Sequence, residues 1–167
     1  MNDEMTDLTS HHIEGYARAA LEAGRPGAFS VPLVSHIEGK LWMGGCIDGV
    51  KLPDDFRFVF SLYPWEKYQI GPSTQRVEFT MYDAAEVPDE EALHDAANLV
   101  VRTLAQGKTL VHCQAGLNRS GLVSALALMK LGRTPREAID LLREKRHPIV
   151  LCNETFENWL LNQGVPR

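Results

Sequence analysis

Residues 112–121 read His-Cys-Gln-Ala-Gly-Leu-Asn-Arg-Ser-Gly, and this stretch decides the fold of the chain. The run 109–111 before it is apolar and β-prone, and the run 122–131 after it is rich in Leu, Val and Ala without proline. These patterns predict a strand that ends at the quoted stretch and a helix that begins within it. The stretch itself is therefore expected to be a short loop at the N-terminus of a helix.

A loop in this position can bind an anion without a metal. The first N–H groups of a helix have no intrahelical partner, and the helix dipole is positive at that end. The same field favours a thiolate over a thiol, so Cys113 is predicted to be a nucleophile at neutral pH. Arg119 adds a planar cationic fork to the same loop. The sequence therefore predicts a phosphate-binding loop equipped for nucleophilic attack.

The pattern His-Cys, five residues, Arg-Ser resembles the signature loop of cysteine-dependent protein tyrosine phosphatases, and the compact chain resembles their dual-specificity type. The resemblance covers most of residues 40–161. The run 41–45 is similar to the early strand and turn of that family. Arg146-His147-Pro148, followed by Asn153 and Phe156, is similar to its closing segment.

The resemblance implies a role for each position of the loop. Cys113 would form a phosphocysteine, and Arg119 would grip two phosphoryl oxygens. Ser120 would donate a hydrogen bond to the cysteine sulfur, and His112 would orient the loop from beneath. Gly116 would let the main chain turn inward. The backbone N–H groups expected to hold the phosphate are those of Gln114, Ala115, Gly116, Leu117, Asn118 and Arg119.

A phosphatase of this type also needs a proton donor for the leaving oxygen. Asp83 follows a strand-like run and precedes a loop, and it lies 30 residues before Cys113, close to the spacing in the dual-specificity family. Asp89 and Glu86 are the alternatives. Asp89 stands at the first turn of the next helix, where a carboxylate is also explained by capping alone.

Composition predicts a small enzyme. The chain has 167 residues, and 44% of them are hydrophobic, which is enough to form one hydrophobic core. The net charge of −5 makes a nucleic-acid-wrapping surface unlikely. No apolar run of about 18 residues is present, and residues 1–10 are polar and acidic. We therefore expect no membrane span, no secretory signal and a cytoplasmic location, and the oligomeric state stays open.

The three cysteines argue against a disulfide framework and against a zinc site. No metal and no cofactor are expected. Cys46 and Cys152 are interpreted as small buried hydrophobic residues. The alternative is that one of them protects an oxidised Cys113 by forming a disulfide with it.

The N-terminal part, residues 1–32, is predicted to hold a helix and a linker, and residues 33–167 to form the catalytic domain. The helix is expected from about His11 to Ala23, with Gly24 as its stop, and the linker from Gly24 to Pro32.

The catalytic part is predicted to be an α/β fold with a short mixed or mostly parallel central sheet and helices on both faces. The capping box at Thr134 and the possible cap at Asn153 mark two helix starts. Strands are expected near His36 and at 41–43, 58–62, 76–82 and 109–112, and helices at about 89–105, 118–131, 134–146 and after Asn153.

These observations favour a metal-independent phosphomonoester hydrolase acting on a phosphoprotein or phosphopeptide. The loop lacks the lysines that phosphoinositide members carry, which disfavours an inositol lipid. The aromatic segment 63–68 is a candidate to flank a phosphotyrosyl ring. One alternative is an RNA 5′-triphosphatase, whose loop is similar in placing Asn before Arg, as Asn118 stands here. The other is a phosphopeptide-binding pseudophosphatase.

Overall fold

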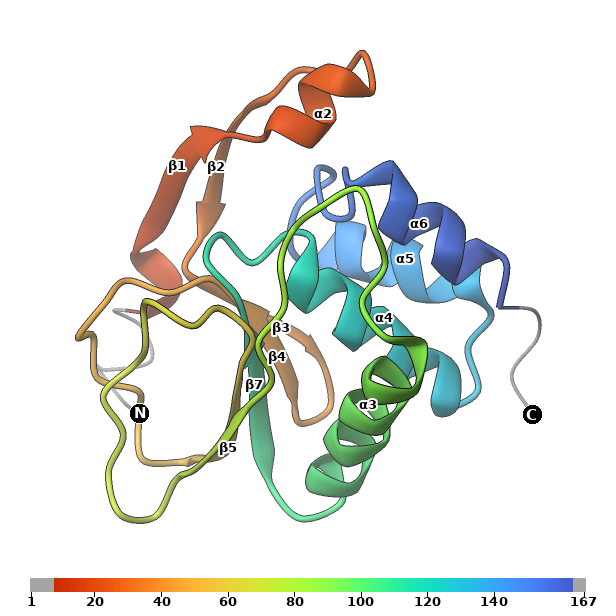
Figure 1. Ribbon diagram of the computed structural model, residues 1–167. Helices are drawn as coiled ribbons and strands as arrows, with labels where there is room; N and C mark the ends of the chain where they lie inside the picture. The colour runs from red at the N-terminus through yellow and green to blue at the C-terminus, as the bar shows by residue number, and fades with distance from the viewer. Residues whose placement is uncertain (1–7, 164–167) are drawn as a thin grey trace.

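A five-stranded sheet stands at the centre of the computed structural model, which describes residues 8–163 (Figure 1). Four longer helices pack beside the sheet, and a two-stranded hairpin projects from it at the N-terminal end. In chain order the elements are β1 (His12–Tyr16), α2 (Arg18–Glu22), β2 (Ala28–Pro32), β3 (Val34–Glu38), β4 (Leu41–Gly44), β5 (Phe56–Ser61), β6 (Gln75–Glu78), α3 (Glu90–Leu104), β7 (Lys108–His112), α4 (Arg119–Lys130), α5 (Pro135–Lys145) and α6 (Glu154–Leu161).

The sheet has the order β3-β4-β7-β5-β6 and is mostly parallel, as predicted. Only β3 runs antiparallel to its neighbour. The central strand β7 lies between β4 and β5, and its last residue, His112, pairs with Gly44 on one side and Ser61 on the other. Since the carboxyl ends of parallel strands meet at one edge of a sheet, the loop after His112 leaves from the edge where ligands usually bind.

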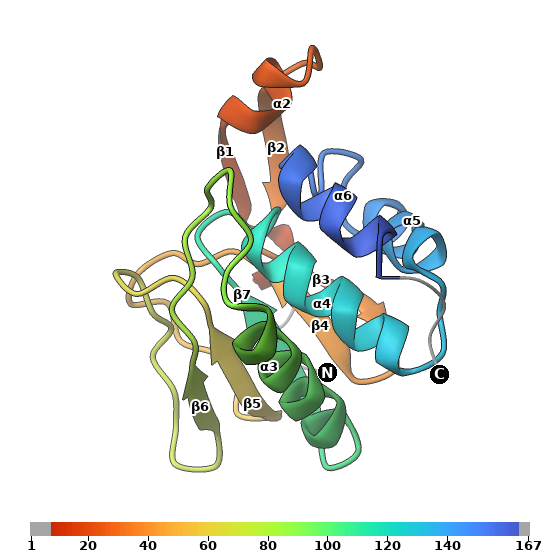
Figure 2. The ribbon, with the colours of Figure 1, turned by 45° about the vertical axis from the view of Figure 1, so that its right-hand side comes forward.

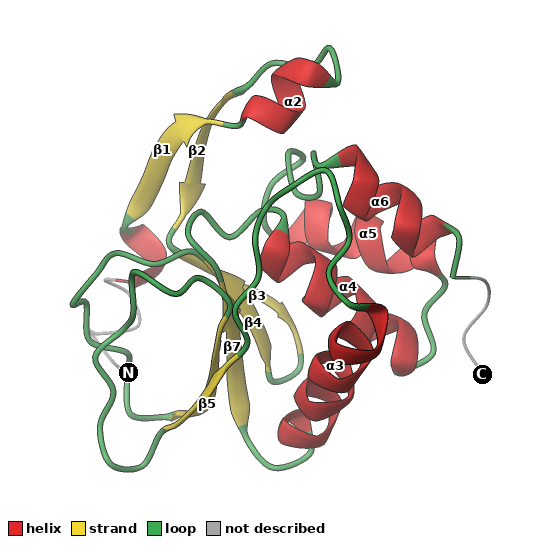
Figure 3. Ribbon diagram, viewed as in Figure 1, coloured by secondary structure: helices red, strands yellow, loops and turns green. Residues whose placement is uncertain are grey.

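Side chains alternate between the two faces of the sheet. Val111 belongs to a large apolar cluster that also contains buried residues of α3, α4, α5 and α6. Leu110 belongs to a second, smaller cluster built with loop residues such as Leu52 and Tyr68. Figures 2 and 3 show these four helices on one side of the strands. The predicted α/β fold with a mostly parallel central sheet is confirmed. The face opposite these four helices is covered by loop residues and by Leu8, which stands in a short helical turn at residues 8–10.

The predicted strands and helices of the catalytic part are otherwise confirmed. Thr134 and Glu137 form the capping box of α5, and Asn153 caps α6. The strand expected at 76–82 ends early, at Glu78, although the N–H groups of Phe79 and Met81 still donate to the carbonyl oxygens of Ser61 and Leu62 at the end of β5. None of the helices in residues 8–163 is long and apolar enough to cross a membrane.

The predicted helix from His11 to Ala23 is wrong, and so is the predicted linker from Gly24 to Pro32. Residues 12–16 form a strand that pairs antiparallel with 28–32, and only the five residues of α2 between them are helical. The spacing of Ile13, Ala17 and Ala20 suits a helix, yet hairpin pairing satisfies the backbone over most of this stretch instead. The boundary after residue 32, between the N-terminal part and the catalytic domain, stays a prediction.

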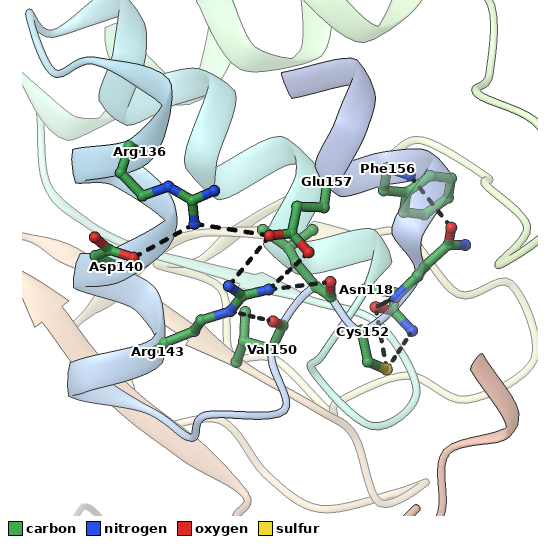
Figure 4. Close-up of polar contacts among 10 residues, drawn as sticks. Asn118, Arg136, Asp140, Arg143, Val150, Cys152, Phe156 and Glu157 are labelled. Carbon is green, nitrogen blue, oxygen red and sulfur yellow. Dashed lines mark hydrogen bonds and ion pairs between the residues drawn. The ribbon is translucent and has the colours of Figure 1, made fainter. Parts of the chain in front are cut away.

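Arg143 ties the closing segment of the chain to α5 (Figure 4). Its Nε donates to the carbonyl oxygen of Val150 (2.9 Å) and its Nη2 to that of Leu151 (3.3 Å). The guanidinium also makes two contacts with the Glu157 carboxylate, the shorter at 3.0 Å. Arg136 reaches the same carboxylate only at 3.7 Å and is half exposed.

We predict that Arg143→Gln lowers the free energy of unfolding by about 2 kcal/mol, because charge-assisted hydrogen bonds in a partly buried site are lost. Arg136→Gln is the matched control and should cost less than about 0.5 kcal/mol, as exposed ion pairs do. Urea denaturation of both variants measures the difference. Equal losses for the two would contradict the role given to Arg143.

Candidate active site

The loop between β7 and α4 surrounds the sulfur of Cys113, which is 2% exposed. The Oγ of Ser120 lies 3.3 Å from the Sγ of Cys113. The backbone N–H of Gly116 donates to the same sulfur at 3.3 Å. The hydroxyl predicted to act on the sulfur is therefore brought to it, and the Gly116 N–H, predicted to face the phosphate, reaches the sulfur as well.

Arg146, at the end of α5, holds the loop from behind. Its Nε donates to the carbonyl oxygen of Gly116 (2.7 Å) and its Nη2 to that of Ala115 (3.0 Å), while Nη1 donates to Ser35 Oγ (3.0 Å). The carbonyl oxygen of Gln114 accepts from the N–H of Cys46 at 2.9 Å. With these three carbonyls directed into the scaffold, the N–H groups of the same peptide units point the opposite way, as a phosphate-binding loop requires.

Sequence reasoning placed Arg146 only in a weakly similar closing segment and gave it no role. Burial lowers the pKa of its guanidinium to about 10, so the group stays cationic at neutral pH.

Gly116 makes the contact between Arg146 and the loop possible. Its φ is +75°, and a Cβ there would lie 2.4 Å from the Gly44 carbonyl carbon and 2.5 Å from Arg146 Nη2.

His112 is the last residue of β7 and directly precedes the loop. The ring is fully buried, and burial lowers its pKa to about 4, so the imidazole is neutral. Its Nδ1–H donates to the Cys113 carbonyl oxygen (3.1 Å), because a carbonyl can only accept, and its Nε2 then accepts from Ser61 O–H (2.8 Å). The imidazole thereby fixes the backbone at the nucleophile.

Arg119 opens α4 and is 8% exposed. Its guanidinium carbon stands 5.0 Å from the centre of the Tyr63 ring, and Nη1 donates to the Met81 carbonyl oxygen at 3.4 Å. Among the described residues, its buried Nε has no hydrogen-bond partner. A buried donor without a partner costs free energy unless a ligand satisfies it, which suits a fork that receives phosphoryl oxygens.

Asp83 is brought to the loop from 30 residues upstream in the chain. Asn118 Nδ2 donates to one carboxylate oxygen (2.9 Å), and Asn153 Nδ2 donates to the other (2.8 Å). Asn118 Oδ1 in turn accepts from the backbone N–H of Asn153 (2.9 Å). The two amides thus clamp the candidate acid between the loop and the N-terminus of α6. Sequence analysis expected the backbone N–H of Asn118 to hold the phosphate and treated Asn153 as a possible helix cap, and it gave neither side chain a contact with Asp83.

The alternative acids do not reach this site. Asp89 caps α3 by accepting from the N–H of Glu91 at 3.0 Å. Glu86 is exposed and is not among the residues that line the cavity at Cys113.

A cavity of about 640 Å³ opens above Cys113. One wall is made by the loop residues 113–115 and 117–119, by 83–85 and by the start of α6 at 153–155. The opposite wall comes from the N-terminal hairpin, with residues 13–19 on one side and Phe29 on the other. The segment that sequence analysis called a helix and linker therefore contributes a wall of the site.

The remaining candidates lie apart from the cavity. Trp65 is 66% exposed and packs against Tyr63 and Tyr82, and none of the three lines the cavity. Cys46 and Cys152 are free and buried. Burial raises the pKa of Cys46 to about 12 and also raises that of Cys152. Residues 8–163 contain no group of three or more His, Cys, Asp or Glu side chains arranged to hold a metal ion.

Comparison with known proteins gives one family and one fold. Residues 55–164 match the family model described as dual specificity phosphatase, catalytic domain. No curated protein matches the chain.

Several solved structures share the fold. The human tyrosine phosphatase-like serine/threonine/tyrosine-interacting protein aligns with a TM-score of 0.67 at 18% identity, covering 76% of this chain and 92% of that one. OH1 from the Orf virus, a tyrosine phosphatase, aligns with a TM-score of 0.62 at 21% identity, covering 79% and 86%. Human DUSP28 aligns with a TM-score of 0.61 at 16% identity, covering 77% and 90%.

The neutral His112 predicts a pH dependence of stability. A histidine in the unfolded chain has a pKa of about 6.5, so the unfolded state binds the extra proton first as the pH falls. The contribution of neutral His112 to the free energy of unfolding is therefore complete above about pH 6.5. It is lost as the pH falls toward about 4, which lowers the free energy of unfolding by about 3 kcal/mol in all. His112→Asn should remove this part of the pH dependence, which urea denaturation across that range measures in both proteins. The same pH slope in the variant and the wild type would contradict it.

Proposed function

Because this chain belongs to the dual-specificity phosphatase family and is a cysteine-dependent protein phosphatase, we propose that it hydrolyses phosphomonoesters without a metal through a phosphocysteine at Cys113. The convergence of three groups on one cavity, with a fourth group against the nucleophile, carries the proposal. The cavity is lined by Cys113, Arg119 and Asp83, and Ser120 contacts the sulfur. These groups also disfavour a pseudophosphatase, which needs only to bind.

In the first step the Cys113 thiolate attacks phosphorus. The S–P bond forms while the bond from phosphorus to the leaving oxygen breaks, and that oxygen takes a proton from Asp83. Arg119 and the loop amides hold the equatorial oxygens, whose charge rises in the transition state.

In the second step water hydrolyses the phosphocysteine. Asp83, now a carboxylate, accepts a proton from the water as its oxygen attacks phosphorus and the S–P bond breaks. Ser120, 3.3 Å from the sulfur, stabilises the departing thiolate by donating a hydrogen bond. Inorganic phosphate leaves, and the thiolate is restored.

The substrate we propose is a phosphotyrosyl protein, with phosphoserine or phosphothreonine as further substrates. The hypothesis of an RNA 5′-triphosphatase rested on Asn118. The side chain of Asn118, however, donates a hydrogen bond to Asp83 and accepts one from the backbone N–H of Asn153. An asparagine used to position an acid supports a monoesterase, because an ester oxygen needs a proton to leave and a triphosphate end does not.

We also propose that the enzyme works in a reducing compartment such as the cytoplasm. All three cysteines are free, and Cys113 must stay a thiolate to react.

The proposal predicts that Asp83→Asn lowers kcat/KM for a phosphotyrosyl peptide about 10²-fold or more, because the leaving oxygen loses its proton donor. Asp89→Asn is the matched control, since Asp89 only caps α3, and it should keep near wild-type turnover. All assays contain a chelator, so turnover itself tests metal independence. A wild-type preference for triphosphate-ended RNA together with an indifferent Asp83→Asn variant would support the triphosphatase instead.

A further inference from the structure

The hairpin that walls the cavity has an open edge. Strands β1 and β2 form a two-stranded antiparallel sheet, and within residues 8–163 neither strand pairs with any other. Each strand therefore has one side along which its backbone N–H and C=O groups are not used by the sheet.

The register shows which groups face that open side of β1. Ala17 N–H donates to the Gly27 carbonyl (2.8 Å), and Leu33 N–H donates to the His11 carbonyl (2.6 Å). Antiparallel pairs alternate between bonded and non-bonded positions, so the odd-numbered residues of β1 bond to β2. Glu14 and Tyr16 then direct their backbone groups away from β2.

The cavity lies along this open edge. The last four residues of β1, 13 to 16, all line it, whereas β2 contributes Phe29 alone. Consecutive residues of a strand point to opposite faces, so all of them border one space only where that space faces the strand's edge. Cys113 lines the same cavity. The nucleophile and an open strand edge therefore share one binding space.

The two edges of the hairpin are not equivalent. Pro32 lies opposite His12 at a non-bonded position of β2, so its backbone faces the outer edge of the hairpin. Proline has no N–H to donate to a strand added at that edge. The residues of β1 include no proline. An edge blunted by proline resists pairing, whereas an edge without it can accept another strand.

The edge is also held in place relative to the catalytic loop. Ala20 and Val31 are fully buried in the large apolar cluster. Ile13 approaches Gly45 so closely that a Cβ at Gly45 would lie 2.4 Å from Ile13 Cδ1 and 2.5 Å from the Gln114 carbonyl oxygen. A preformed edge costs less to bind than one that must order first.

We propose that the open edge of β1 is the peptide-binding site of this enzyme. An extended phosphopeptide adds to β1 as a third strand and directs its phosphorylated side chain to Cys113. This inference rests on the proposed phosphatase function. Main-chain hydrogen bonds supply affinity with little dependence on sequence, and alternate side chains of the peptide face the cavity. The hairpin lies outside residues 55–164, so the family match does not include this surface.

The test compares two proline variants of the hairpin. Glu14→Pro removes an N–H that faces the cavity, and Ser30→Pro removes one from the residue directly opposite, on the far edge of the hairpin. Each is assayed with a phosphotyrosyl peptide and with p-nitrophenyl phosphate, which has no peptide backbone. The ratio of kcat/KM for the peptide to kcat/KM for p-nitrophenyl phosphate should fall about tenfold in Glu14→Pro, because one hydrogen bond to the peptide is lost. The same ratio should stay at the wild-type value in Ser30→Pro. Equal ratios for the two variants would overturn the inference.

A second measurement uses only the wild-type enzyme, so it does not depend on how the variants fold. Phosphotyrosyl peptides are N-methylated at one backbone position at a time. Strand pairing predicts that kcat/KM falls at every second position on each side of the phosphotyrosine. Uniform tolerance of methylation would overturn the inference. Failure of the wild type to hydrolyse p-nitrophenyl phosphate would instead overturn the proposed function on which it rests.

Discussion

The contact between Arg146 and the catalytic loop is the constraint on which the rest of the site depends. One buried guanidinium joins the end of α5, the strand β3 through Ser35, and the carbonyl oxygens of Ala115 and Gly116. Because the carbonyls are held from behind, the amides can gather around an anion in front of Cys113. The glycine at 116 is required by the same contact, since a side chain there would collide with the guanidinium.

A second set of contacts couples the acid to the nucleophile. Asn118 stands in the catalytic loop and Asn153 at the start of α6, and each donates to one oxygen of the Asp83 carboxylate. The acid lies on an exposed loop, which would otherwise be free to move. Arg143 holds the segment before Asn153 against α5, so the position of the acid depends on packing far from the cavity.

The sequence allowed prediction of the features that are local in the chain. Cys113 and Ser120 are seven positions apart on one strand–loop–helix turn, so their spacing alone indicates that they meet. Arg146 and Ser35 are 111 positions apart, and no spacing rule connects them. The N-terminal prediction failed for a related reason. A helical spacing of apolar residues also fits a hairpin, and only the pairing of β1 with β2 decides between the two.

The central claim is that Cys113 carries the phosphoryl group during turnover. Rapid acid quench of the enzyme during hydrolysis of a labelled phosphotyrosyl peptide, followed by peptide mapping, tests this claim most directly. The account predicts label on the peptide that contains Cys113, in an amount that rises in Ser120→Ala because breakdown of the phosphocysteine is slowed. Turnover with no label on Cys113 in either protein would contradict it.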